Sequence, residues 1–229
     1  MAKLSAQNEI VDCRRCSRLV QYREAVAREK VRRFKDWEYW GRPVPSLGTP
    51  DARLLIVGLA PAAHGGNRTG RIFTGDRSGD WLYRALHKFG FANQPTSTHR
   101  DDGLQLIDCY ITAAIHCAPP DNKPLPAEFV NCRPYLLEEL ERLKRVQAVV
   151  ALGQIGFKTY LSARKQLGWK NPEPMPPFGH DLAVTLPDGV TLISSYHPSQ
   201  QNTLTGKLTE KMFDDVFRRA KKLIERPQR

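Results

Sequence analysis

A glycine-rich loop in the first third of the chain has the composition of a ligand-binding loop. Residues 60–80 read APAAHGGNRTGRIFTGDRSGD and contain five glycines. Glycines at this density let backbone N–H groups approach a ligand closely, and the guanidinium groups of Arg68 and Arg71 suit phosphate oxygens. The loop contains neither the phosphate-binding pattern GxxxxGKS/T nor the dinucleotide pattern GxGxxG. It therefore gives poor support to a nucleotide cofactor.

Asp76 lies among the cations of this loop, and nearby cations keep a carboxylate ionised. An ionised carboxylate in a ligand-binding loop is a candidate functional residue. An aspartate that forms a turn or caps a helix accounts for the same residue equally well. The residues alone leave both interpretations open.

Two further polar clusters follow strand-like runs. His197 precedes a proline in YHPSQQN, and proline holds the preceding residue in an extended conformation. A loop histidine of this kind is more often a surface residue than a catalyst. Asn122, in CAPPDNKP, carries a donor and an acceptor that can read the edge of a base, but it also suits an ordinary turn.

Four of the five cysteines have the spacing of a metal site. Cys13 and Cys16 form a CxxC pair, and Cys117 and Cys132 lie far downstream. Cys109 lies in an apolar run and is expected to be a buried core thiol. Four thiolates suit tetrahedral zinc and an iron–sulfur cluster alike, and their spacing does not separate the two.

The composition favours a globular protein with a polyanionic partner. The 229 residues are 41% hydrophobic and 26% charged, which excludes wholesale disorder. Thirty-five Lys and Arg against 24 Asp and Glu give a net charge of +11, as expected of a protein that binds nucleic acid. No apolar run approaches the ~20 residues of a membrane span, and the first residues lack the apolar stretch of a signal peptide. We expect a cytoplasmic protein without membrane contacts.

The elements that must position these residues alternate along the chain. Strand-like runs are expected at 53–59, 106–115, 148–152, 183–186 and 190–195. Helices are expected at 18–34, after a cap at Ser78 or Asp80, and at 127–143, 153–161 and 207–224. Residues 37–50, rich in Trp, Gly and Pro, are expected to form an ordered loop. The alternation predicts a layered α/β fold with a mostly parallel central sheet, whose ligands bind beyond the carboxyl ends of the strands.

Two long motifs give these residues a family resemblance. GLAPAAHGGNRTGRIFTGDRSGDWL at 58–82 and YHPSQQNTLTGKLT at 196–209 resemble the signature motifs of family 5 uracil-DNA glycosylases, the iron–sulfur type. CAPPDNKP and the four spaced cysteines are similar as well, so the resemblance covers nearly the whole chain. Lys207 departs from the arginine of the family pattern, and the GLAPA opening differs from the GEAPG of the sister family 4.

The resemblance implies a monofunctional glycosylase that extrudes uracil from DNA and hydrolyses the N-glycosidic bond, in a single three-layer α/β/α domain spanning residues 1–229. Phe73 would stack on the base and Asn122 would read its Watson–Crick edge. Asp76 would stabilise the sugar cation and activate water, and His197 would hydrogen-bond the departing base. The other substrate-binding positions would be Gly58, Ala60, Arg68, Arg71 and Asn202.

The resemblance also implies a cofactor, partners and a cellular place. A 4Fe-4S cluster, rather than zinc, would be held by Cys13, Cys16, Cys117 and Cys132. The partner would be DNA containing uracil or another deaminated base such as hypoxanthine or xanthine, and the enzyme would act in base excision repair as a monomer near the nucleoid.

Two other interpretations remain open. A non-enzymatic metal-containing module that uses the four cysteines and binds nucleic acid explains the charge and the metal. A nucleoside or nucleotide hydrolase explains the glycine-rich loop but not the charge.

Overall fold

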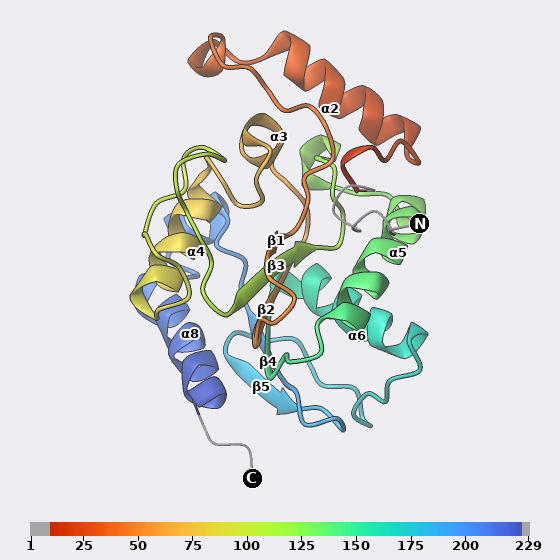
Figure 1. Ribbon diagram of the computed structural model, residues 1–229, viewed down its shortest axis with the longest axis vertical. Coiled ribbons are helices and arrows are strands. Elements are labelled where there is room, and N and C mark those ends of the chain that lie inside the picture. Colours follow the sequence, from red (N-terminus) through yellow and green to blue (C-terminus); the bar gives the residue numbers. More distant parts are fainter. Residues whose placement is uncertain (1–9, 226–229) are drawn as a thin grey trace.

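The computed structural model describes residues 10–225, which pack around one six-stranded sheet (Figure 1). The strand order is β1-β3-β2-β4-β6-β5, and the inner strands β3, β2, β4 and β6 are parallel. The edge strands β1 and β5 run antiparallel to their neighbours. The strands are β1 (Leu47–Gly48), β2 (Leu54–Gly58), β3 (Cys109–Ala113), β4 (Ala148–Leu152), β5 (Leu182–Thr185) and β6 (Thr191–Ser195).

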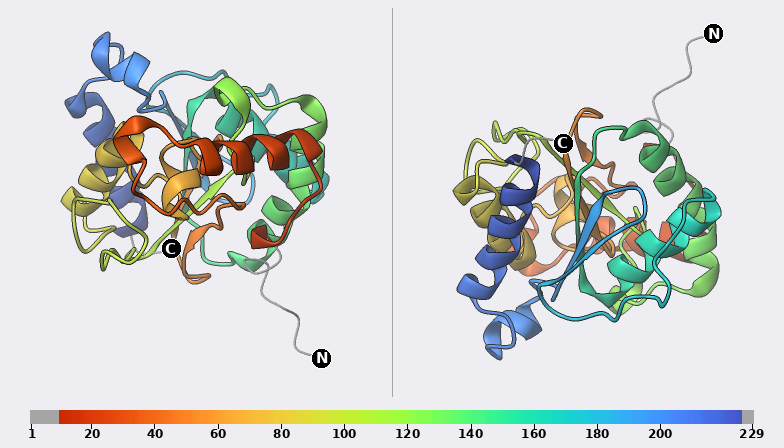
Figure 2. Two further views of the ribbon diagram at one scale, coloured as in Figure 1. Left: turned by 90° about the horizontal axis from the view of Figure 1, so that it is seen from above. Right: turned by 90° about the horizontal axis from the view of Figure 1, so that it is seen from below.

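Helices cover both faces of the sheet and complete three layers (Figure 2). On one face, α4 (Arg77–Lys88) and α8 (Glu210–Glu225) pack their apolar stripes against side chains such as Ile56. On the other face, α5 (Pro126–Arg142) and α6 (Gly153–Gln166) pack against side chains such as Leu55. Neighbouring residues of one strand thus enter opposite cores, because side chains alternate across a strand. The three-layer α/β/α fold expected from the sequence is confirmed.

Shorter elements gather where the parallel strands end. The α3 helix (Gly66–Thr69) follows β2, the 3-10 turn η2 (Pro120–Asn122) follows β3, and α7 (Gln200–Leu204) follows β6. The N-terminal helix α2 (Ser17–Glu29), followed by the 3-10 turn η1 (Arg32–Phe34), crosses above this edge of the sheet (Figure 1). The carboxyl edge of the sheet is therefore the region where loops from distant parts of the chain meet, as the fold class predicts.

Several element boundaries differ from the sequence-based expectations, and the helix expected at 153–161 extends to Gln166. The helix expected to be capped by Ser78 or Asp80 begins at Arg77, with Asp76 as its N-cap. The helix expected at 18–34 ends at Glu29, and the strand expected at 106–115 is shorter. The Trp-, Gly- and Pro-rich segment contains β1, which pairs with β3 and was not expected. Cys109 is buried as predicted. Among the described helices, none has the length and apolar character required to cross a bilayer.

Candidate active site

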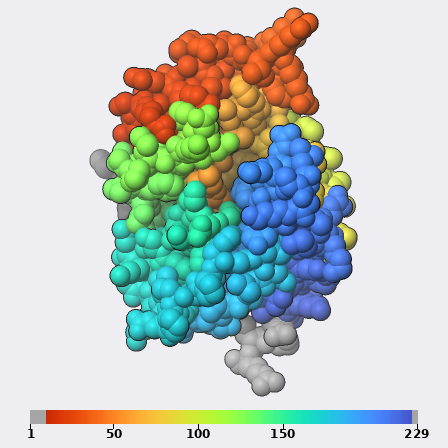
Figure 3. Space-filling model, turned by 180° about the vertical axis from the view of Figure 1, so that it is seen from behind, coloured from red at the N-terminus to blue at the C-terminus, as the bar shows by residue number. Residues whose placement is uncertain are grey.

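An open cleft with a volume of about 770 Å³ lies at the carboxyl edge of the sheet. Residues 62–65 and 75–77, the segment 119–122 and Gln200 of α7 line it from the sheet side. Tyr22, Arg33, Phe34 and Trp37 line it from the N-terminal side. Figure 3 shows the surface hollowed between the orange-red segment at the top and the blue segment that contains α7. The three loops expected to carry the ligand site therefore meet at one cleft.

Asp76 lies in this cleft at the N-terminus of α4. Its Oδ1 accepts a hydrogen bond from the backbone N–H of Gly79 at 3.0 Å, so the residue is a helix cap as well as a candidate base. Burial raises the pKa of the Asp76 carboxyl above its usual value, although the backbone N–H groups of Gly79 and Ser78 oppose the rise. A Cβ atom on Gly65 would lie only 2.0 Å from Asp76 Oδ2. Glycine at position 65 thus makes room for the carboxylate.

Phe73 and His197 lie side by side although they are far apart in the sequence. Their rings stack with centroids 6.0 Å apart and an angle of 29° between the planes. Phe73 is buried and has a positive φ of 51°, which turns its ring back over β2. A Cβ on Gly58 would lie 2.9 Å from Phe73 Cζ, so Gly58 acts by leaving space for this ring. Burial lowers the pKa of His197 to about 4, which keeps the imidazole neutral at ordinary pH.

The two predicted asparagines have different surroundings. The side-chain Nδ2 of Asn202 donates to the backbone carbonyl of His197 at 2.9 Å, so Asn202 holds the loop that carries the histidine. Asn122 is exposed and lies in the same cleft as Asp76. Its positive φ of 56° is one that asparagine tolerates better than most residues. Among the described residues, its side-chain amide has no hydrogen-bond partner, so it is available to a ligand.

The two predicted phosphate-binding arginines are both buried and already engaged. Arg71 donates to both carboxylate oxygens of Asp102, at 2.8 and 2.7 Å, and to Ser97 Oγ at 2.8 Å. Arg68 donates to the carbonyl oxygens of His64 and Gly75. Both arginines therefore help to hold the loop, and their contact with phosphate stays a prediction.

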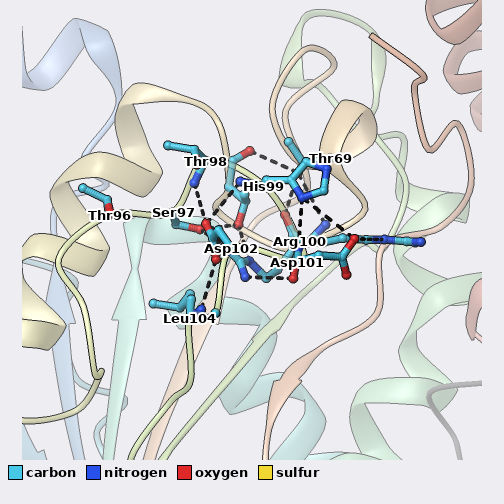
Figure 4. A network of polar contacts seen from close by, with 12 residues as sticks. Thr69, Thr96, Ser97, Thr98, His99, Arg100, Asp101, Asp102 and Leu104 are labelled. Carbon is cyan, nitrogen blue, oxygen red and sulfur yellow. Dashed lines mark hydrogen bonds and ion pairs between the residues drawn. The ribbon is translucent and has the colours of Figure 1, made fainter.

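The Asp102 carboxylate anchors the segment that follows α4 (Figure 4). Burial would raise the pKa of this carboxyl, but the Arg71 guanidinium and the backbone N–H groups of His99, Leu104 and Thr98 outweigh that effect and lower it to about 2. Figure 4 shows Asp102 between Thr98 and Leu104, with dashed contacts to the segment around it. This network is fully satisfied and fixes one wall of the cleft.

Cys13, Cys16, Cys117 and Cys132 line one small cavity between α2 and α5. The structure thus brings the four predicted ligands together from three distant parts of the chain. Ala60, predicted to bind substrate, lies on this side and packs against the apolar cluster that contains Cys117. Among residues 10–225, however, no three His, Cys, Asp or Glu side chains are placed so as to hold a metal ion.

The surroundings of the four cysteines suit thiolate ligands. Burial raises the pKa of the Cys117 thiol to about 11, so a thiolate needs a nearby cation. Arg23, itself buried, donates to Cys117 Sγ at 2.9 Å. The backbone N–H of His116 donates to Cys132 Sγ at 3.3 Å, and Asn131 Nδ2 lies 3.5 Å from Cys16 Sγ. Such donors stabilise negative charge on sulfur.

Several residues of the cleft were not identified from the sequence. Phe34 and Trp37 stack on the Arg68 guanidinium, with its central carbon 3.9 and 4.0 Å from the two ring centroids. The aromatic and basic composition of residues 30–40 was the one available signal, but it does not say which face of the molecule this segment covers. The pairing of Arg71 with Asp102 spans 31 positions and had no local signal at all.

Comparison with known proteins agrees with this geometry. Over residues 45–221 the chain matches the family model of the uracil DNA glycosylase superfamily, and it belongs to that superfamily. It is 53% identical over 212 residues to the type-5 uracil-DNA glycosylase of Mycobacterium bovis, covering 92% of this chain and 78% of that protein. It is 52% identical over 222 residues to the type-5 enzyme of Mycobacterium leprae, covering 96% and 94% of the two chains.

A similar match links the chain to an archaeal relative. The type-5 uracil-DNA glycosylase of Pyrobaculum aerophilum is 48% identical over 213 residues, with 93% of this chain and 89% of that protein covered. The resemblance drawn from the two sequence motifs is therefore confirmed.

Proposed function

We propose that this protein excises uracil from DNA by hydrolysing the N-glycosidic bond, as the first step of DNA repair. The observation that carries the proposal is the position of Asp76, a carboxylate on a helix N-terminus within an open cleft. The same cleft presents the amide of Asn122, which has no hydrogen-bond partner among the described residues. The motifs shared with type-5 uracil-DNA glycosylases at about 50% identity support it. The net charge of +11 suits a DNA substrate.

The chemistry needs a flipped nucleotide, because the C1′–N1 bond is inaccessible inside a duplex. As this bond breaks, its electron pair leaves with the base and the sugar gains positive charge. Asp76 stabilises that charge and accepts a proton from the water whose oxygen bonds to C1′. His197, neutral because of its low pKa, donates a hydrogen bond to the departing uracil anion. Phe73 provides the stacking surface, and Asn122 hydrogen-bonds the edge of the base.

The cysteine cavity would hold a 4Fe-4S cluster rather than zinc. The four thiols share one cavity, which suits tetrahedral zinc and an iron–sulfur cluster alike. The resemblance of the sequence motifs to the iron–sulfur type of glycosylase favours the cluster. The cluster would neutralise thiolate charge and tie the N-terminal segment to β3 and α5; no catalytic step passes through it.

The size of the cleft suits purine bases as well as uracil. Ala62, Ala63 and Gly65 line it with little side-chain bulk, so a purine has room. We therefore propose that hypoxanthine and xanthine are also substrates. A monomeric state and a cytoplasmic, nucleoid-associated location remain predictions from the sequence.

The test is a cleavage assay on end-labelled duplexes that carry one uracil, hypoxanthine or xanthine. A strand break that appears only after hot alkali is the result expected of a monofunctional glycosylase. Free deoxyuridine serves as a second substrate, because its hydrolysis would favour a nucleoside hydrolase. Tight binding of the duplex without base release would instead favour the non-enzymatic binding module.

A further inference from the structure

Residues 30–37, here called the basic arm, carry a dense set of unpaired cations. The arm reads KVRRFKDW and follows directly after α2. Four of its first six residues are basic, and among the described residues none of the four forms an ion pair: Lys30, Arg32, Arg33 and Lys35. Like charges so close together repel one another, so the arm favours an anionic partner outside this chain.

The arm leaves α2 at a fixed turn. Lys30 has a positive φ of 50°, a conformation that ends the helix and sends the chain toward the cleft. In Figure 1 this part of the chain lies at the top, above α3. The α2 helix is held in place by Arg23, which donates to Cys117 Sγ and accepts a hydrogen bond on its carbonyl from Asn67 Nδ2.

The arm is fastened to the active-site loop by aromatic stacking on Arg68. Phe34 and Trp37 contact the guanidinium at 3.9 and 4.0 Å, and Trp37 also packs against His99 at 5.9 Å between ring centroids. Arg68 is buried, and in the part of the chain that the structure describes it has no carboxylate partner and its Nη1 has no hydrogen bond. Burying an unpaired cation costs folding free energy. The stacking of Phe34 and Trp37 on this cation therefore indicates that a fixed position of the arm is important to the protein.

The arm forms the rim of the cleft opposite α7. Arg33, Phe34 and Trp37 line one side, whereas Arg77 and Gln200 line the other. Arg77 and Arg33 both lower the pKa of the Asp80 carboxyl between them, although burial has the larger effect and raises it. A nucleotide that enters the cleft toward Asp76 must leave its neighbouring phosphates at this rim, where Arg33 and its neighbours lie.

We propose that the basic arm is a DNA-binding element, in which the guanidinium groups of Arg32 and Arg33 bind backbone phosphates beside the extruded nucleotide. The arm thereby grips the strand from the side opposite α7. This inference rests on DNA being the substrate. Arg32 and Arg33 are exposed, so their guanidinium groups can reach the phosphates of a bound strand.

The test measures the affinity of the protein for a duplex with one abasic-site analogue, over a series of salt concentrations. The logarithm of the observed association constant falls linearly with the logarithm of the salt concentration, with a slope of about 0.9 for each phosphate that the protein neutralises. The double variant Arg32→Ala/Arg33→Ala is expected to reduce this slope by about 2 and to weaken binding by roughly tenfold at moderate salt.

The matched control is Lys144→Ala/Arg145→Ala, which removes the same charge at the opposite edge of the sheet, just before β4. It should leave the slope unchanged, and Arg32→Lys/Arg33→Lys should keep the wild-type slope. An unchanged slope in the arm variant, or an equal loss in the control, would overturn the proposal. If the wild type itself fails to bind the duplex, the proposed function fails and the arm proposal with it.

Discussion

In the cleft, Asp76 lies where a large substrate can reach it, whereas the thiols of the cysteine cavity gather around a space too small for a substrate. Both regions bury ionisable groups, and in both burial raises a pKa, that of Asp76 and that of Cys117. Within residues 10–225, the hydrogen-bond donors to the Asp76 carboxylate are backbone N–H groups. The cavity supplies its sulfurs with Arg23, backbone and amide donors. The cleft thus leaves a reactive carboxylate accessible, whereas the donors around the cavity stabilise negative charge on fixed sulfur atoms.

The largest expected effect comes from removing the charge of Asp76. Asp76→Asn should lower the single-turnover excision rate by about 10²–10⁴-fold, because the carboxylate is lost while the helix cap is kept. The folded state binds the Asp76 proton more tightly than the unfolded state does, so this carboxyl opposes folding at neutral pH. The Asp76→Asn variant should therefore have a thermal midpoint no lower than that of the wild type.

The control is Asp80→Asn, which removes the same charge from the first turn of the same helix and also lines the cleft. It should change the rate only a few-fold. Equal losses in both variants would mean that the cleft needs negative charge in general, and the distinction between the two carboxylates would fail.

The second effect separates the cavity from the cleft. Cys132→Ser should abolish retention of iron and sulfide, measured by metal analysis and visible absorption, because a hydroxyl is a poor ligand for iron. Cys109→Ala is the control, since this buried thiol lies in β3 and does not line the cavity. Full iron content in Cys132→Ser would contradict the assignment of the ligands, and zinc in place of iron in the wild type would contradict the cluster.

The third effect concerns the wall of the cleft. Asp102→Asn leaves Arg71 buried opposite a neutral amide, and breaking a buried ion pair in this way costs about 3–5 kcal/mol of unfolding free energy. The pKa of Asp102 is lowered to about 2. Its stabilising contribution is therefore present above the unfolded pKa and is lost as the pH falls toward 2. Denaturant unfolding at several pH values measures the loss of unfolding free energy and its pH dependence. The control is the exposed neighbour Asp101, for which Asp101→Asn should change stability by less than about 1 kcal/mol.

The smallest effect is the shape of the pH–rate profile. The excision rate should fall as the pH drops through the raised pKa of Asp76, because the protonated carboxyl neither accepts a proton nor stabilises a cation. His197, with its pKa lowered to about 4, should add no inflection near neutral pH. An inflection close to the ordinary histidine value of about 6.5, lost in His197→Asn, would show that the histidine titrates during catalysis.

Local sequence patterns predicted most of the helices and strands of this protein. The strand at 148–152 is found as predicted, and the strand at 53–59 differs only at its ends, because short β-branched runs buried on both faces have few alternatives. The end of α2 was missed because a positive φ at Lys30 interrupts a pattern that otherwise continues as a helix. β1 was missed because two residues paired to β3 leave no periodicity.

The sequence predicted the location of several site residues, and their roles stay predictions. Asp76, Phe73, Asn122 and His197 lie at or beside the cleft as the motifs implied. The ion pair of Arg71 with Asp102 could not be predicted, because the two residues lie in different loops. Tertiary pairing of this kind depends on the whole fold, and no window of sequence contains it.

The gathering of the cysteines has a consequence for the chain's topology. Cys16 and Cys117 are about 100 positions apart, and the segment between them contains β2, the glycine-rich loop, α4 and β3. The cluster proposed for this cavity would join the two ends of this segment in the folded protein, so its binding would be coupled to folding. Loss of the cluster would free both ends, and the loop that carries Asp76 would then lose a tether on each side.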